Sequence, residues 1–251
     1  MQPNANHSSS VERAFELIGI VAAAGPQGIQ LSGLAKRAHL AVSTCHRYAT
    51  TLLDLAVLDR DAAGNFRLGI GLVALAGRYL EEDSLRATAH PHLVELSQIS
   101  GETVHLGTLA GDHIVYIDKI ESDKSVRLVS RIGAQAPLHC TSMGKAILAA
   151  LPETDRERSI ADDNEIRTPH TLVGDALREE LNLIRTCGWA IDDQENEEGV
   201  RCIGAAIIST SGTPVGALSI SAPANRFSRQ DCELLAPQVT AAARDIGRRI
   251  G

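Results

Sequence analysis

Hydroxyl and other small polar residues gather in the second half of this chain. Ser219 and Ser221 alternate with two apolar residues, so a strand would place both hydroxyls on one face. Residues Thr141–Gly144 can open a helix, whose free backbone N–H groups and dipole favour a carboxylate or a phosphate. These features predict a site for a small anion near Ser142–Met143 and Ser219–Ser221. The alternative is that the two hydroxyls bond neighbouring backbone instead.

Thiol chemistry and metal binding receive little support from the residue pattern. Five cysteines are an odd number without a CxxC pair, which argues against a disulfide framework and a zinc ribbon. Cys140 follows His139, but adjacent strand residues point to opposite faces, and no GxSxG, HExxH or Walker motif occurs. The nine histidines are scattered, and His90-Pro91-His92 reads as a solvated part of a linker. We therefore expect no enzyme activity, metal or other cofactor, and keep a thiol-dependent enzyme and a metal-responsive regulator as alternatives.

The elements of the first half predict a DNA-binding unit. Residues Leu31–Leu68 read as helix, tight turn, helix and short hairpin, the layout of a winged helix-turn-helix. We expect Ser10 and Ser32 to cap the first two helices, and the third to run from about Val42 to Leu55. A short hairpin of Val57–Arg60 and Phe66–Leu68 forms the wing.

The third predicted helix has the polarity of a recognition helix. Cys45, Ala49 and Leu52 share one face, while short hydroxyls and one arginine lie away from it. The net charge is −7, yet no Asp or Glu occurs between Leu17 and Leu53, so this region can be locally attractive to phosphates. The alternative is an ordinary amphipathic helix with a solvated side. The predicted DNA contacts are Lys36, Ser43, Thr44, His46, Arg47, Thr51 and, in the wing, Arg67.

The remaining elements predict an α+β domain behind a helical linker. Strands fit residues 103–109, 114–120, 126–129, 204–209 and 215–221, and helices fit 142–151, 176–186 and 230–249. This order favours a mainly antiparallel sheet. We expect disorder before Ser8, a winged helix-turn-helix over 8–68, a linker helix over 69–84 and a second domain over 85–251. Without an apolar run of membrane length or a signal peptide, the chain is expected to be cytoplasmic with no membrane partner.

Several motifs together resemble the IclR family of bacterial transcriptional regulators. They are Val11-Glu12-Arg13-Ala14, Ser43-Thr44-Cys45-His46-Arg47, Gly64–Gly69, Gly101–Gly107, Ala136–Ala149, Asp192–Ile207 and Ala217–Pro223. The resemblance covers nearly the whole chain and rests on their joint order and spacing. It implies a winged helix-turn-helix, a helical linker and a GAF-like effector-binding domain. It also implies homodimers or tetramers on palindromic double-stranded operators, and small carboxylates or aromatic acids as effectors.

The resemblance also implies which residues contact the effector. The matching positions are Ser142, Met143, Asp192, Cys202, Ser219 and Ser221, with an apolar wall of Val126, Leu128, Ala136 and Val200. By itself, Asp192 opens an acidic run that favours a solvated loop, and Lys145 reads as a solvated charge in the first turn of its helix. The expected function is ligand-responsive regulation of a catabolic operon, as a repressor, with coupling through the linker helix.

Overall fold

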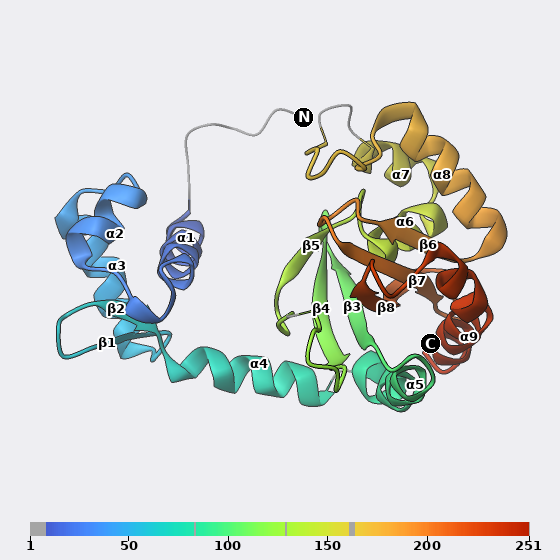
Figure 1. Cartoon of the computed structure of the whole chain (residues 1–251). Helices are drawn as coiled ribbons and strands as arrows, with labels where there is room; N and C mark the ends of the chain where they lie inside the picture. Colours follow the sequence, from blue (N-terminus) through green and yellow to red (C-terminus); the bar gives the residue numbers. More distant parts are fainter. Residues whose placement is uncertain (1–8, 83, 129, 161–163, 251) are drawn as a thin grey trace. The chain divides into compact units, whose positions relative to one another are not determined.

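The computed structural model describes residues 9–82, 84–128, 130–160 and 164–250 (Figure 1). The chain divides into two compact units, and the boundary along the sequence lies between residues 82 and 83. Each unit is described by itself below. The disorder predicted before Ser8 and the predicted strand residue Val129 lie outside the described residues.

The first unit begins with three helices. Helix α1 (Ser10–Ala23) is capped by Ser9, whose hydroxyl accepts from Glu12 N while the Glu12 carboxylate accepts from Ser9 N, so the prediction of a Ser10 cap was wrong by one residue. After the 3-10 turn η1 (Gly25–Gln27), helix α2 (Leu31–Arg37) starts without a side-chain cap, and Ser32 lies inside it. His39 adopts a left-handed φ of 52° in the turn before α3 (Val42–Asp54).

A hairpin and a further helix complete this unit. Strands β1 (Leu58–Arg60) and β2 (Phe66–Leu68) pair antiparallel, and Ile29 pairs with Phe66 on the other side. Buried residues of all these elements form one core, which includes Leu17, Leu34, Cys45, Leu52, Leu58 and Phe66. The predicted winged helix-turn-helix is therefore confirmed. Helix α4 (Ile70–Glu82) follows, and none of its described residues is buried.

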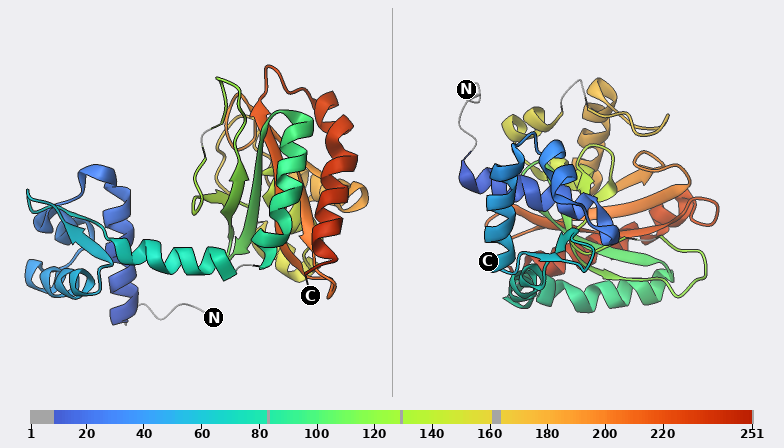
Figure 2. Two further views of the ribbon diagram at one scale, coloured as in Figure 1. Left: turned by 90° about the horizontal axis from the view of Figure 1, so that it is seen from below. Right: turned by 90° about the vertical axis from the view of Figure 1, so that its left-hand side faces the viewer.

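The second unit is an antiparallel sheet covered by helices on both faces. Its helices are α5 (Ser84–Ser100), α6 (Ser142–Ala150), α7 (Glu153–Ser159), α8 (Gly174–Cys187) and α9 (Arg229–Gly247). Its strands are β3 (Thr103–Ala110), β4 (His113–Ile120), β5 (Gln135–Pro137), β6 (Ala190–Asp193), β7 (Val200–Ile208) and β8 (Pro214–Pro223), ordered β5-β4-β3-β8-β7-β6. Helices α5 and α9 pack side by side on one face, and α6 packs on the other with α8 behind it (Figure 2). The predicted α+β class with a mainly antiparallel sheet is confirmed.

Three elements of the second unit differ from the sequence prediction. Residues 126–128 form no strand, because this segment pairs with no neighbouring strand and the Val126 carbonyl instead accepts a hydrogen bond from Arg226 at 2.7 Å. The short strands β5 and β6 form the two edges of the sheet, and neither was predicted. Helix α7 was also missed.

The start of α6 lies directly against the sheet. A Cβ atom on Gly204 of β7 would come within about 3 Å of Ser142 Oγ and Met143 N, so a larger residue would push the start of α6 outward by a few tenths of an ångström. Apolar residues of α6 and α8, among them Ile147, Leu148, Leu177 and Leu181, bury that face of the sheet. In the described parts of the chain, no helix is both long and apolar enough to cross a membrane.

Candidate functional site

The sheet register brings distant polar residues into neighbouring rows. Asp192 of β6 faces Cys202 of β7, and Cys202 faces Ser221 of β8. One step along, Ser219 of β8 faces His105 of β3. Residues paired across strands point to the same face of a sheet. These side chains therefore share the face on which α6 lies.

A cavity of about 710 Å³ opens between this face, the start of α6 and the segment after β4. A volume of this size matches the range of small-molecule sites, roughly 300–1,000 Å³. Of the predicted effector contacts, those that line it are Ser142, Met143, Asp192, Cys202, Ser219, Ser221, Leu128, Ala136 and Val200. Val126 does not line it: this side chain is 66% exposed, because its segment turns outward toward Arg226.

The first turn of α6 presents free backbone donors to the cavity. The Thr141 hydroxyl caps the helix by accepting from Gly144 N at 3.1 Å, and the Thr141 carbonyl accepts from Lys145 N at 2.8 Å. Within the described residues, the N–H groups of Ser142 and Met143 keep no such partner. The start of this helix can therefore hold an anion.

His105 and Tyr116 are cavity residues that the sequence reasoning missed. The His105 ring lies 5.0 Å from that of Tyr116, with Nε2 at 2.7 Å from Ser130 Oγ and Nδ1 at 3.4 Å from Ser221 Oγ. Burial lowers the pKa of His105 to about 4, so the ring is neutral near pH 7. The alternation of the segment Thr103–Gly107 was a usable signal, since it sets His105 opposite the apolar face. Further missed lining residues are Arg127, Ser130, Arg131, Gln135, Thr141, Arg167, Asn196 and Glu197.

Two charged residues are buried where the sequence favoured solvation. Lys145 is completely buried, because α6 packs between the sheet and α8. Asp192 lies in β6 and is 2% exposed, not in a solvated loop. Burial, aided by the nearby Glu195 carboxylate, raises the pKa of Asp192 to about 7.

Within the described residues, the cysteines and histidines show no arrangement suited to catalysis. Burial raises the pKa of Cys140 to about 12, whereas a nucleophilic cysteine needs a lowered pKa. His139 does not activate it, since its Nε2 lies 3.0 Å from the carbonyl oxygen of Glu165. Among the residues that the structure describes, no three His, Cys, Asp or Glu side chains gather as metal ligands would.

The predicted DNA contacts lie mainly on the outside of the first unit. Lys36, Ser43, His46, Arg47, Thr51 and Arg67 are exposed, and Thr44 is half-buried. Arg47 extends along the Tyr48 ring, 5.6 Å from its centroid. In the wing, Arg67 forms a 2.7 Å ion pair with Asp61, which offsets part of its charge. The guanidinium of Arg47 is therefore more available to a phosphate or a base edge than that of Arg67.

Comparisons with known proteins cover almost the whole chain. A family model described as "Bacterial transcriptional regulator IclR C-terminal" matches residues 77–248, and one described as "IclR helix-turn-helix domain" matches residues 10–62. The regulator KdgR of Escherichia coli (strain K12) is 33% identical, over 96% of this chain and 94% of its own. The transcriptional repressor IclR of the same organism is 30% identical, over 97% of this chain and 90% of its own.

A solved structure extends the similarity to the fold. The IclR protein of Thermotoga maritima matches with a TM-score of 0.75 and 32% identity, over 98% of this chain and 100% of that one. Both units therefore have counterparts in a single protein of known structure.

Proposed function

Since the chain belongs to the IclR family of transcriptional regulators, we propose that its cavity binds a small organic or aromatic acid and thereby controls DNA binding. The family consists of non-enzymatic regulators that bind DNA through the helix-turn-helix domain. We further propose that this chain acts in the cytoplasm as a repressor of a catabolic operon. The similarity to a protein named as a repressor supports that direction of control.

The observation that carries the proposal is the polar floor of the cavity. Ser142, Ser219 and Ser221 are each at most 4% exposed yet line an open space of about 710 Å³. Buried hydroxyls and backbone N–H groups without a full set of partners favour a ligand that supplies oxygen acceptors. Arg127, Arg131 and Arg167 also line the space, and their charge favours an anion. We propose that the acid places its carboxylate near Ser142–Met143 and Ser219–Ser221.

Calorimetric titration of the full chain with a panel of catabolic acids tests the effector site. Ser219→Ala and Ser221→Ala should each weaken binding by about 1 kcal/mol or more, because each removes a buried donor. Ser211→Ala, in the loop between β7 and β8 and outside the cavity lining, is the matched control. Unchanged affinity in both cavity variants would count heavily against the proposed site.

At the DNA end, we propose that Lys36, Ser43, Thr44, His46, Arg47, Thr51 and Arg67 contact the operator. Arg47→Ala should weaken operator binding by roughly 1–3 kcal/mol if this arginine reads a base. If it contacts only phosphate, all sequences should be weakened about equally and the salt dependence should become shallower. Gel shifts with the region upstream of the chain's own gene and a scrambled fragment separate these outcomes. Arg13→Ala, whose arginine pairs with Glu16 on α1, is the control.

We also propose that the protein binds a palindromic operator as a homodimer or a tetramer. Phe15 of α1 and Ile70, Val73 and Leu75 of α4 are large apolar side chains that are more than half exposed. Apolar surface of this kind favours association with another chain. Sedimentation of the native chain beside a Val73→Glu variant tests this. A monomeric native protein at micromolar concentration would contradict it.

A further inference from the structure

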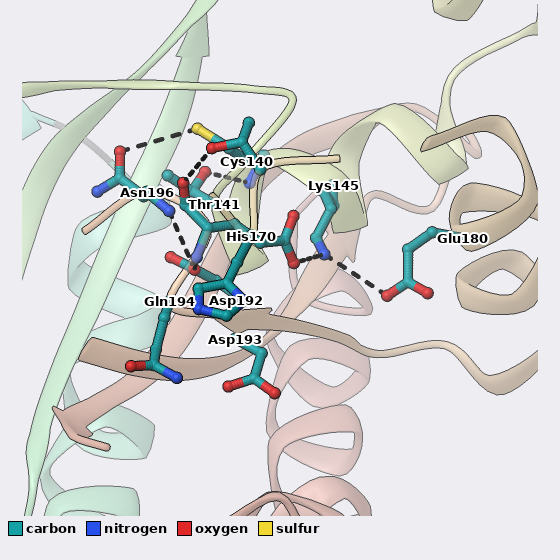
Figure 3. Close-up of polar contacts among 12 residues, drawn as sticks. Cys140, Thr141, Lys145, His170, Glu180, Asp192, Asp193, Gln194 and Asn196 are labelled. Atoms are coloured by element: carbon teal, nitrogen blue, oxygen red, sulfur yellow. Dashed lines mark hydrogen bonds and ion pairs between the residues drawn. The ribbon is translucent and has the colours of Figure 1, made fainter. Parts of the chain in front are cut away.

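A buried cluster of charges lies beside the cavity, with Lys145 of α6 at its centre. The Lys145 ammonium is 2.5 Å from Glu195 Oε1 and 3.5 Å from Glu180 Oε1 (Figure 3). Both contacts draw the lysine toward these two glutamates. This buried ammonium is thus already shared between two carboxylates, and Asp192 is a third carboxylate nearby.

One carboxylate oxygen of Asp192 accepts hydrogen bonds, and the other does not. Oδ1 accepts from Glu195 N at 2.8 Å and from Asn196 N at 3.3 Å. Oδ2 makes no hydrogen bond within the part of the chain that the structure describes, and Asp192 lines the cavity. The unpartnered oxygen is therefore available to whatever enters that space.

Within the described residues, the Asp192 carboxylate forms no ion pair with a cation. The acidic, thiol and ring groups around it are Glu180 on α8, Glu195 and Glu197 after β6, Cys202 on β7, Tyr116 on β4, His105 on β3 and Cys140 before α6. The cations are Lys145 on α6, Arg167, and Arg127 and Arg131 after β4, and Arg127 pairs with Glu121 at 3.3 Å. Arg167 donates to the Asn196 carbonyl at 3.3 Å and pairs with Glu165 at 3.5 Å. His105 is neutral, since burial lowers its pKa to about 4. Even without a ligand, burial and the Glu195 charge raise the pKa of Asp192 to about 7.

We propose that Asp192 takes up a proton when an organic anion enters the cavity, and that its Oδ2–H then donates a hydrogen bond to the anion's carboxylate. The proton comes from solvent, and no other bond is made or broken. The physical reason is that two carboxylates in direct contact do not both stay ionised. This rests on the proposed function, because it requires that the effector be an acid. It makes the regulator respond to the acid and to pH together.

The pH dependence has a definite sign. Only the protonated form of Asp192 receives the anion, so binding is strongest at pH values below the pKa of Asp192 in the free protein. Above that value, affinity falls about tenfold for each pH unit. With the midpoint near 7, binding at about pH 8 should be about tenfold weaker than at about pH 6.

Asp192→Asn gives a matched test, because its amide has an acceptor oxygen and a donor group like the protonated carboxyl but does not titrate. The amide oxygen can accept from Glu195 N and Asn196 N, while Nδ2 donates into the cavity. The probe is acetate, the smallest stable carboxylate, titrated calorimetrically into the full chain in two buffers of different ionisation enthalpy. Glu198→Gln is the control, because Glu198 is exposed, lies outside the cavity lining, and changes the net charge equally.

The wild type and the control should bind acetate about tenfold more weakly at the higher pH and take up about one proton there. Asp192→Asn should bind equally at both pH values with no proton uptake. Carbon NMR of the wild-type Asp192 carboxyl gives a second readout that does not depend on the variant's folding: acetate should raise its titration midpoint. If the wild type binds acetate equally at both pH values, or if acetate does not move the titration midpoint of Asp192, the proposed proton uptake is refuted while the acid site is not. Failure of acetate to bind even at about pH 6 would refute the acid site itself, and the proton uptake with it.

Discussion

At the residue scale, the stability of the second unit depends strongly on the ammonium of Lys145. Its side chain is completely buried, and Oε2 of its partner Glu195 already lacks a hydrogen-bond donor among the described residues. Lys145→Met should therefore destabilise the protein by about 3–5 kcal/mol, the usual effect of breaking a buried ion pair on one side. Chemical denaturation measures this.

Two further variants show whether the missing charge is the cause. Adding Glu195→Gln to Lys145→Met should restore part of the stability, because it removes the unpaired carboxylate. Arg158→Met breaks an exposed pair with Asp155 and should change stability by less than about 1 kcal/mol. A double variant no more stable than Lys145→Met would contradict a role for the charge.

Asp192 should make the stability of the protein depend on pH. The folded chain holds the Asp192 proton more tightly than the unfolded chain, since burial raises the pKa from 3.8 to about 7. Below pH 3.8, the pKa of Asp192 in the unfolded chain, this residue does not lower the free energy of unfolding. As the pH rises from there to about 7, the free energy of unfolding falls, in total by about 1.4 kcal/mol for each unit of difference between the two pKa values. Asp192→Asn should thus be more stable than the wild type at about pH 8 and equal to it at about pH 4. Thermal melts across this range check the trend, and a difference independent of pH would contradict it.

At the scale of the elements, the approach of α6 to its neighbours depends on glycine. A Cβ atom on Gly144 would collide with the carbonyl oxygen and Cα of Leu138, which are backbone atoms with little room to move. Gly144→Ala should therefore cost about 1–3 kcal/mol and shift the start of α6, which weakens acid binding as well. Gly77→Ala in α4 meets nothing within 4 Å and should be neutral or stabilising by up to about 1 kcal/mol. Equal melting temperatures for the two variants would show that α6 tolerates a displacement.

Local patterns were enough to predict the elements whose burial has a simple period. The alternation of Ser219 and Ser221 with apolar residues predicted β8, and the three-to-four residue spacing of Cys45, Ala49 and Leu52 predicted α3. Strand β6 was missed because Asp192 and Asp193 read as the start of an acidic loop. Their partners are distant in sequence: the carboxylate of Asp193 pairs with Arg201 and Arg229, while Asp192 is buried beside Cys202.

The candidate site could be predicted only where a residue carries its own local signal. Ser142 and Met143 were found from a helix start, and the resemblance to a family added Asp192 and Cys202. The alternation of Thr103–Gly107 indicates the face on which His105 lies, but the place of His105 and Tyr116 at the cavity depends on the pairing of β3 with β8 and β4, which a single sequence does not reveal. Lys145 was misjudged for the same reason, because Glu180 and Glu195 are far from it along the chain.

At the scale of the whole molecule, charge is divided unequally between the two units. Residues 1–82 hold seven Lys or Arg and seven Asp or Glu, so the net charge of −7 belongs to the second unit. An acidic second unit is repelled by DNA phosphates, and the repulsion is screened by salt. Because this repulsion does not depend on base sequence, it should weaken binding to operator and non-specific DNA alike, most strongly at low salt.

The division into two units also predicts a separable effector domain. A fragment from Ser84 to Gly251 keeps the sheet, its covering helices and every cavity residue named above. It should unfold cooperatively and bind the same acid as the full chain, within about twofold, but should not bind the operator. Calorimetry and gel shifts on the fragment check both points. A folded fragment that binds no acid would show that the cavity needs the first unit.

The edges of the six-stranded sheet have a consequence for the protein's behaviour at high concentration. Its edge strands β5 and β6 contain three and four residues, whereas the four inner strands contain eight to ten. Short edges expose few unpaired backbone groups, which limits the templated growth of one sheet onto another. These short strands pair with residues 113–115 of β4 and residues 201–204 of β7, so the hydrogen-bonding rows along these stretches are closed to a second sheet.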